Sequence, residues 1–176
     1  VQRGGPSTGI PTKHEQGDLN LMFGGQGDFP RIVLAPKDTE DAFYTAGRAL
    51  NLAEKYQMPV LVLSDLFLSE HFQTVEAFKF DMPIERGKVQ GSIEGTYKRY
   101  LITEDGISPR LVPGLPGGMY VSASDEHDET GNVISDVLAG LPSSLEIRNK
   151  IHAKRMKKLE VARAEDIHLP TLSGPA

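Results

Sequence analysis

The sequence predicts an α/β fold with part of a doubly wound parallel sheet, followed by a long irregular excursion and a C-terminal helix. Residues 31–35, which are apolar after Arg31, and residues 59–63 form short apolar runs, as expected for buried strands of a parallel sheet. A helical pattern separates them, which gives a strand–helix–strand crossover of right-handed sense. Beyond residue 72 this periodicity fades, and it returns in a last helix near the C-terminus.

A helix over residues 13–23 is expected before the first strand, ended by the glycine pair at 24–25. Pro36 ends the first strand, and Ser64 with Asp65 ends the second. In this order the elements make up half of a doubly wound α/β domain.

The crossover helix can be capped by Asp38 or Thr39, whose side-chain oxygens can accept backbone hydrogen bonds. Apolar residues at helical spacing predict the face that packs on the sheet. This stripe consists of Phe43, Ala46, Leu50 and Ala53, widened by Ala42 and Ala49.

Glycine and proline accumulate between residues 72 and 143, where helical and strand periodicity are weak. So long a stretch is usually a functional or interface segment of a larger assembly. Short extended pieces are expected at residues 99–103 and 119–122.

The final helix is predicted to run from a capping box at Ser143 and Glu146 to about residue 161. Its apolar residues lie on or near one face: Leu145, Ile151, Met156 and Leu159. The other face is basic, with Arg148, Lys150, Lys154, Arg155, Lys157 and Lys158. A solvated face is the favoured interpretation, and contact with an acidic partner surface remains open.

Composition excludes several classes of function. A formal net charge of -5 over 176 residues argues against a dedicated nucleic-acid binder, which needs a basic surface. No apolar run approaches the roughly 20 residues that span a bilayer, and the N-terminus lacks a secretory signal pattern, so a cytoplasmic location is expected. The absence of cysteine excludes disulfides and thiolate-bound zinc or iron–sulfur sites within this chain.

The first twelve residues combine an arginine with glycines, prolines and hydroxyl side chains. Glycine lets the main chain approach a ligand, proline stiffens the path, and a guanidinium can hold a carboxylate or phosphate through two parallel hydrogen bonds. The composition therefore indicates an anion-binding loop. A purely structural Arg3 is the alternative, and Ser7 and Thr8 could equally form turn or capping bonds. No Gly-Lys-[Ser/Thr] triplet follows Gly9, which disfavours a nucleotide-phosphate loop.

The acidic run at residues 125–129 surrounds His127 with four carboxylates. Hard-cation sites need spaced oxygen ligands, so a solvated or partner-facing loop is favoured over a metal site. His14, His71, His152 and His168 show no ligand spacing. Residues 103–110 could form an internal salt-bridged loop or a subunit contact, and the contact is favoured.

The chain resembles the alpha subunit of the 2-oxoacid:ferredoxin oxidoreductases, a family of thiamine diphosphate enzymes that includes 2-oxoglutarate:ferredoxin oxidoreductase. Matching motifs follow one another in order along nearly the whole chain. They lie at residues 2–12, 15–19, 29–36, 51–56, 59–65, 97–100, 103–110, 118–121, 125–129 and 154–159.

The resemblance implies roles for the N-terminal loop. Arg3 is similar to the arginine that faces the carboxylate of the 2-oxo acid, and Thr12 to a hydroxyl donor to the same substrate. Ser7 and Thr8 would contribute to substrate binding. Gly4, Gly5 and Gly9 would shape the loop. No catalytic residue and no metal ligand is expected in this chain.

The resemblance also implies the chemistry of the complete enzyme. It would oxidatively decarboxylate a 2-oxo acid, 2-oxoglutarate being favoured, to the acyl-CoA and pass electrons to ferredoxin. Thiamine diphosphate, Mg and a [4Fe-4S] cluster would be held mainly by the partner beta subunit.

The implied domains are the C-terminal part of a thiamine-diphosphate pyrimidine-binding domain (1–75), an irregular interface excursion (76–143), a helix (144–165) and a linker to a following domain (166–176). The family's Tyr-Pro-Ile-Thr-Pro motif and its activating glutamate are not found in this chain. A fragment that is inactive by itself is therefore expected. Two alternatives remain: a non-catalytic assembly or regulatory subunit, and a small anion- or nucleotide-binding α/β module.

Overall fold

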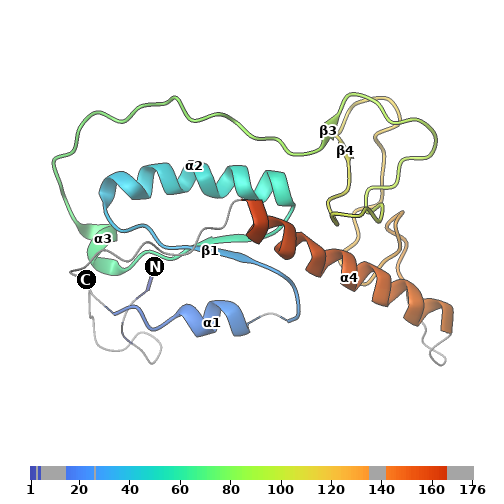
Figure 1. The fold of residues 1–176 in the computed structure, drawn as a ribbon, viewed down its shortest axis with the longest axis horizontal. Coiled ribbons are helices and arrows are strands. Elements are labelled where there is room, and N and C mark those ends of the chain that lie inside the picture. The colour runs from blue at the N-terminus through green and yellow to red at the C-terminus, as the bar shows by residue number, and fades with distance from the viewer. Residues whose placement is uncertain (3, 5–14, 26, 135–141, 166–176) are drawn as a thin grey trace. The chain divides into compact units, whose positions relative to one another are not determined.

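The computed structural model describes residues 1–2, 4, 15–25, 27–134 and 142–165. The chain divides into two compact units, Val1–Gly87 and Lys88–Ala176. The structure is of the mixed α/β class that the sequence predicts (Figure 1). Each unit contains a small parallel sheet, and the second unit ends in a long helix. No helix among the described residues has the length and apolar character needed to cross a bilayer.

The first unit is built around a parallel pair of strands joined by a helical crossover. Its elements are α1 (Leu19–Gly24), β1 (Ile32–Leu34), α2 (Thr39–Tyr56), β2 (Val60–Val62) and α3 (Leu66–Glu70). The strand register pairs Ile32 with Val60 and Leu34 with Val62. The predicted crossover is therefore confirmed, with each strand shorter than its apolar run. The core of this unit consists of Ile32, Leu52, Tyr56, Met58 and Leu63.

Helix α2 begins where the sequence predicts, and of the two candidate caps Asp38 is the one used. Its carboxylate accepts a hydrogen bond from the Asp41 amide at 2.8 Å. The helix ends at Tyr56 because Gln57 adopts a left-handed conformation, with φ of 51°.

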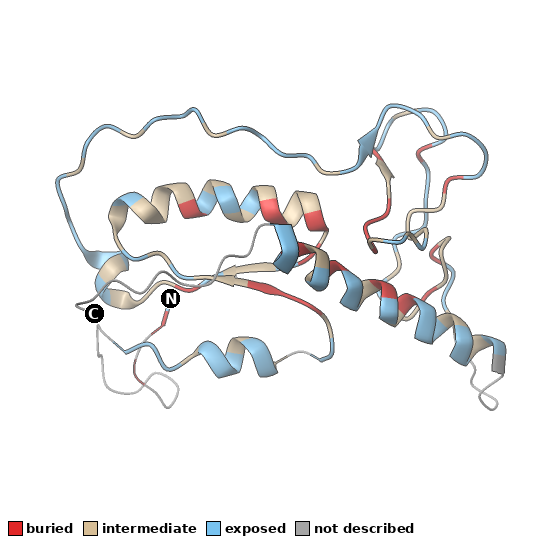
Figure 2. Cartoon of the chain, viewed as in Figure 1, coloured by how far each residue is buried: buried red, intermediate tan, exposed pale blue. Residues whose placement is uncertain are grey.

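The predicted sheet-facing stripe of α2 is wrong. Leu50 is 69% exposed and Ala46 is also exposed, while the buried residues are Thr45, Leu52 and Tyr56 (Figure 2). Their spacing of seven and four residues is still helical. A pattern of apolar residues does not mark Thr45 and Tyr56 as core positions, because both side chains carry a hydroxyl group. Threonine and tyrosine can nevertheless be buried in a folded protein.

The outer side of α2 is covered by the segment of residues 71–87, which lies along the helix without forming a helix or strand (Figure 1). Asn51 binds this strap twice, donating to the Pro83 carbonyl at 2.8 Å and accepting from the Glu85 amide at 3.0 Å. Phe43 stacks on Phe78 with ring centroids 4.2 Å apart. Phe43, predicted to face the sheet, thus packs against the strap.

Helix α1 is shorter than expected. It starts after Asp18 and not near residue 13, and described residues 15–18 are not helical. Its end before Gly25 is as predicted. Gly17, a poor helix former, precedes the observed start.

In the second unit, β3 (Val89–Gln90) pairs in parallel with β4 (Arg110–Leu111), and α4 spans Pro142–Glu165. The expected extended pieces at 99–103 and 119–122 are not strands, since the strand pairing in this part of the described chain uses other residues. Their side chains are used for contacts within loops: Tyr100, for example, accepts a hydrogen bond from the Ala123 amide at 3.1 Å.

Helix α4 differs from its prediction at both ends and in its buried face. It already includes Pro142, so Ser143 lies inside it and the capping box is wrong; proline is well suited to a first helical turn. It extends to Glu165, beyond the predicted end. Leu145 is 53% exposed and Met156 is also exposed, whereas Ile151 is buried as predicted. The remaining buried residues are Lys154, Lys158 and Ala162.

Candidate functional site

A hollow of about 410 Å³ lies where the carboxyl ends of β1 and β2 meet. Ala35, Pro36 and Lys37, which follow β1, form one side of it. Leu63 and Asp65, which follow β2, form another. Ligands of open α/β sheets bind at this edge, because the loops that leave the strands converge there. The hollow is therefore the candidate site of the first unit.

Asp65 organises one wall of the hollow. One carboxylate oxygen accepts from the Leu68 amide at 2.7 Å and caps α3, and the other accepts from the Gln16 side-chain amide at 2.8 Å. The helix behind Asp65 is held as well, since the Ser64 and Ser69 hydroxyls lie 2.8 Å apart. A single carboxylate thus fixes both α3 and a residue distant in sequence.

Gln2 lies beside the end of β2 and is 6% exposed. Its amide donates to the Ser64 carbonyl, its carbonyl accepts from the Leu66 amide at 3.1 Å, and together they make a parallel bridge to Asp65. Its side-chain oxygen accepts from the Asp18 amide at 3.3 Å. Gln2 and Gln16, on either side of residues 3–14, are thereby both attached at Asp65.

Most predicted site residues are not placed by the structure. Arg3, Gly5, Ser7, Thr8, Gly9 and Thr12 lie outside the described residues. Gly4 is described and is buried. The structure places the residues that flank the predicted anion-binding loop, Gln2 and Gln16, among those that line the hollow.

Sequence reasoning missed Gln2, Gln16 and Asp65 as site residues. Asp65 could have been found, because a polar residue directly after a parallel strand is expected at the ligand-binding edge. No local pattern marks the two glutamines, whose role depends on contact with residues about fifty to sixty positions away.

The hollow combines amides, carboxylates and one ammonium with an apolar wall. Leu63, Phe67 and Leu68 supply the apolar surface, and Phe67 stacks on His71 with centroids 5.0 Å apart. The Gln2 side-chain nitrogen has no hydrogen-bond partner among the described residues. Such a surface suits a small planar or short-chain polar ligand. Within the described part of the chain, no group of His, Asp and Glu side chains could hold a metal ion.

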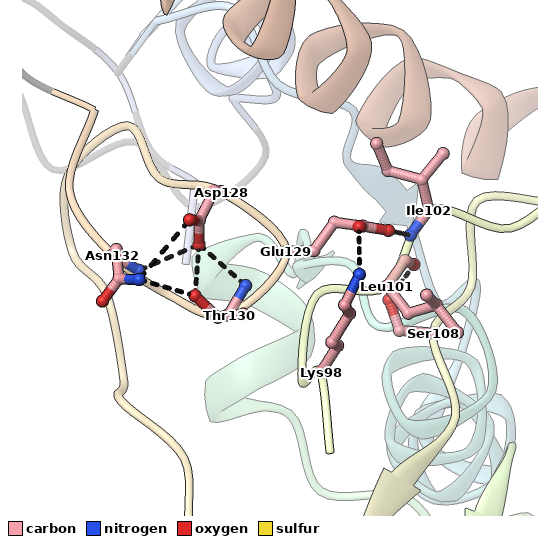
Figure 3. Close-up of polar contacts among 8 residues, drawn as sticks. All are labelled: Lys98, Leu101, Ile102, Ser108, Asp128, Glu129, Thr130 and Asn132. Atoms are coloured by element: carbon pink, nitrogen blue, oxygen red, sulfur yellow. Dashed lines mark hydrogen bonds and ion pairs between the residues drawn. The ribbon is translucent and has the colours of Figure 1, made fainter. Parts of the chain in front are cut away.

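The acidic run at 125–129, predicted to be a solvated or partner-facing loop, makes contacts within its own unit. Glu129 accepts from the Lys98 ammonium at 2.9 Å and from the Ile102 amide at 2.7 Å (Figure 3). Asp128 accepts from the Thr130 amide and hydroxyl at 2.8 and 2.6 Å (Figure 3). Burial alone raises the pKa of both carboxyls, but these hydrogen bonds outweigh it and lower the pKa.

Glu126 and His127 also make contacts within the second unit. Glu126 binds both terminal nitrogens of the Arg155 guanidinium, at 3.0 and 3.1 Å, and this pairing lowers the pKa of Glu126. His127 is buried against the Tyr100 ring, with centroids 4.0 Å apart. Contacts within the second unit pair two of the four carboxylates of the run, Glu126 and Glu129, with basic side chains.

Residues 103–110 form an internally bonded loop, which was one of the two alternatives for this segment. Asp105 pairs with Lys88 and accepts from the Thr103 hydroxyl at 2.9 Å and the Ile107 amide at 3.1 Å. Burial opposes these contacts, yet together they lower the pKa of Asp105. The fully buried Ser108 donates to the Leu101 carbonyl at 2.9 Å (Figure 3).

The fold and the position of the hollow define the first unit as an α/β ligand-binding domain whose loops converge at the carboxyl edge of a parallel sheet. Residues 1–141 match the family described as pyruvate flavodoxin/ferredoxin oxidoreductase, thiamine diphosphate-binding. The chain therefore belongs to this family.

Similar proteins carry related names. The chain is 47% identical to "2-oxoacid:ferredoxin oxidoreductase 1, subunit alpha" of Sulfurisphaera tokodaii, over 93% of this chain and 25% of that protein. Over 37% of this chain and 10% of the relative, it is 53% identical to "2-oxoglutarate oxidoreductase subunit KorA" of Mycobacterium tuberculosis. These relatives are subunits of oxidoreductase complexes. The chain spans about a quarter of the first relative's length.

A solved structure has the same fold. It is the 2-oxoglutarate:ferredoxin oxidoreductase from Magnetococcus marinus with 2-oxoglutarate, coenzyme A and succinyl-CoA bound. The TM-score is 0.80 at 43% identity, covering 100% of this chain and 30% of that one. The resemblance expected from the sequence motifs is thus confirmed at the level of family and fold.

Proposed function

We propose that this chain is the part of a 2-oxoacid:ferredoxin oxidoreductase alpha subunit that binds the 2-oxo acid, with 2-oxoglutarate as the substrate. The complete enzyme would decarboxylate the acid oxidatively, form the acyl-CoA and reduce ferredoxin. The observation that carries the proposal is the 47% identity over 93% of the chain to an alpha subunit of such an enzyme. The attachment of both Gln2 and Gln16 at the ligand-binding edge of the sheet supports it.

In this proposal Arg3 holds the carboxylate of the 2-oxo acid. A guanidinium can pair with a carboxylate through two parallel hydrogen bonds, which fixes the orientation of the acid as well as its charge. Thr12 donates a further hydrogen bond, assisted by Ser7 and Thr8. Gly4, Gly5 and Gly9 let the backbone pass close to the ligand. Orientation of this kind matters because misplacement by about 1 Å can cost about a hundredfold in rate.

The residues of the hollow fit the pyrimidine side of thiamine diphosphate. Leu63, Phe67 and Leu68 offer an apolar wall, and the buried Gln2 offers an amide nitrogen that has no partner among the described residues. When bound, the cofactor would supply the nucleophilic chemistry for decarboxylation of the keto acid. This chain's own residues would border the ring and orient the acid. Mg and a [4Fe-4S] cluster would lie on the partner beta subunit, which agrees with the absence of cysteine here.

The proposal also assigns parts of the chain to larger units. Residues 1–75 would complete a pyrimidine-binding domain, 76–143 would form an interface within the enzyme, 144–165 a helix, and 166–176 a linker to a following domain. The enzyme would work in the cytoplasm, where it meets ferredoxin.

The test is substitution of Arg3 in the complete enzyme. Arg3→Ala should raise the KM for 2-oxoglutarate strongly, because the substrate carboxylate loses its charged partner, whereas Arg3→Lys should recover part of the loss. The matched control is Arg163→Ala, which removes an exposed arginine from α4. Unchanged KM and kcat in Arg3→Ala would remove Arg3 from the substrate site.

A further inference from the structure

Asp105 and Gly106 form the one Asp-Gly pair of the sequence. In such a pair the glycine amide nitrogen can attack the carboxyl carbon of the aspartate side chain. A nitrogen–carbon bond forms, the carboxyl group loses its hydroxyl as water, and a succinimide ring closes. Glycine favours this reaction because it has no side chain to shield its amide nitrogen.

Hydrolysis of the ring gives two products. Water that attacks the former side-chain carbonyl restores aspartate. Water that attacks the former main-chain carbonyl breaks its bond to the glycine nitrogen and leaves isoaspartate, in which the main chain runs through the former side chain. The whole sequence of steps needs no reagent other than water.

The fold requires glycine at position 106. Gly106 is buried and has φ of 75°, in the left-handed region that favours glycine. A Cβ at this position would collide with the Lys154 carbonyl and lie 3.3 Å from the Lys157 Cβ. The backbone of the turn therefore packs directly on α4, and Asp105 keeps the neighbour with which it reacts most readily.

Both reacting groups are engaged in other contacts. The Asp105 carboxylate pairs with the Lys88 ammonium. It also accepts from the Thr103 hydroxyl at 2.9 Å and from the Ile107 amide at 3.1 Å. Burial raises the pKa of Asp105, but the hydrogen bonds that it accepts outweigh this effect and lower the pKa. The carboxylate is therefore ionised at neutral pH, and an ionised carboxylate is a poor electrophile.

The attacking nitrogen is held as well, because the Gly106 amide donates to the Thr103 carbonyl at 3.1 Å. The chain on each side of the turn is also fixed. Ser108 donates to the Leu101 carbonyl at 2.9 Å, and Glu129 accepts from the Ile102 amide at 2.7 Å (Figure 3). Ring closure thus requires the turn to leave its position on α4.

We propose that Asp105–Gly106 is a latent isomerisation site, which the folded second unit keeps in the aspartate form by holding the turn on α4 and the carboxylate on Lys88. Isoaspartate would add one carbon to the main chain of the turn and remove one from the side chain. The lengthened backbone would lie where Gly106 already touches α4, and the shortened side chain would lose its three donors. A turn that has isomerised while open therefore could not return to its place.

The test compares the complete enzyme, folded and in denaturant, after incubation at neutral pH in water enriched in heavy oxygen. Each hydrolysis of the ring adds one heavy oxygen atom to the chain. Trypsin, used in ordinary water, releases residues 100–110, in which Asp105 is the one aspartate. Mass spectrometry of this peptide gives the label, and chromatography separates the isoaspartate form. The rate should be about tenfold or more higher in denaturant, because the folded chain reacts only while the turn is open.

Lys88→Met should raise the rate in the folded enzyme about fivefold, the upper value for a partly exposed ion pair. It should not change the rate in denaturant. Thr103→Val tests the same contact if Lys88→Met fails to assemble. Lys98→Met is the matched control, because Lys98 pairs with Glu129 and is 42% exposed, against 43% for Lys88. Lys98→Met should react at the wild-type rate.

Three results would overturn the proposal. Equal rates in the folded and the denatured enzyme would show that the turn gives no protection. A denatured chain without label or isoaspartate in residues 100–110 would show that no reactive site exists there. Equal rates in Lys88→Met and Lys98→Met would show that the pair with Asp105 does not hold the turn.

Discussion

The Gln16 side chain donates a hydrogen bond of 2.8 Å to Asp65, a residue 49 positions away in the sequence. On the other side of residues 3–14, Gln2 forms a parallel bridge with the same Asp65. The segment that carries the proposed substrate residues is thus attached on both sides to the end of one parallel strand. Because Asp65 also caps α3, one carboxylate holds both this helix and the Gln16 side of the segment.

Asp65→Ala should therefore affect both properties. Loss of the cap should lower the free energy of unfolding by about 1 kcal/mol, and release of Gln16 should raise the KM for the 2-oxo acid. Denaturant unfolding of the subunit and steady-state kinetics of the complete enzyme measure the two effects. Gln16→Ala is the matched control, because it keeps the cap and should change KM alone. Equal loss of stability in both variants would argue against this division of roles.

Thr12→Ala should weaken binding of the 2-oxo acid by about 1 kcal/mol, as expected for the loss of one neutral hydrogen bond. Initial-rate kinetics should show this as a higher KM, and Thr12→Ser, which keeps the hydroxyl, should restore it. A KM that stays at the wild-type value in Thr12→Ala would make Thr12 a structural residue.

Asn51→Ala should loosen the strap of residues 71–87 on α2. The variant loses the hydrogen bonds to the Pro83 carbonyl and the Glu85 amide, each worth about 1 kcal/mol. Hydrogen exchange should become faster in peptides that cover the strap, while β1 and β2 keep their protection. Leu50→Ala, at an exposed position of the same helix, serves as the control. Unchanged exchange in the strap would show that other contacts hold it.

Stability should depend on pH through Lys154. The pKa of Lys154 is about 7 in the folded chain and 10.5 for an ordinary lysine, so between these values the unfolded chain binds more protons. The free energy of unfolding should then rise with pH from about 7 to 10.5, and the destabilisation should be complete below pH 7. The charged groups acting on Lys154 are Lys158, Arg99, Arg155 and Asp105.

Lys154→Met should raise the free energy of unfolding most at pH 6 and reduce its increase toward pH 10. Chemical denaturation of the complete subunit at several pH values measures both effects. Lys150→Met should leave the pH profile unchanged. The prediction is wrong if Lys154→Met and the wild type have parallel profiles over this range.

The crossover of the first unit could be predicted because its signals are local. The apolar runs that become β1 and β2, the Asp38 cap and the glycine pair at the end of α1 each act on residues within a few positions. The motifs at Arg3 and along the rest of the chain also indicated the family, because each motif is a run of neighbouring residues. The capping box at Ser143 failed because Pro142 already belongs to the helix.

By itself, the sequence determined the α/β class, the order of strand, helix and strand, and the family, because periodicity, caps and motifs are encoded by neighbouring residues. Only the tertiary structure decided which faces are buried and which charges are paired. Leu50 is exposed and Lys154 is buried, against their usual preferences, and Glu129 binds Lys98 from 31 positions away. Such choices depend on the surfaces that distant segments present, and no local pattern carries that information.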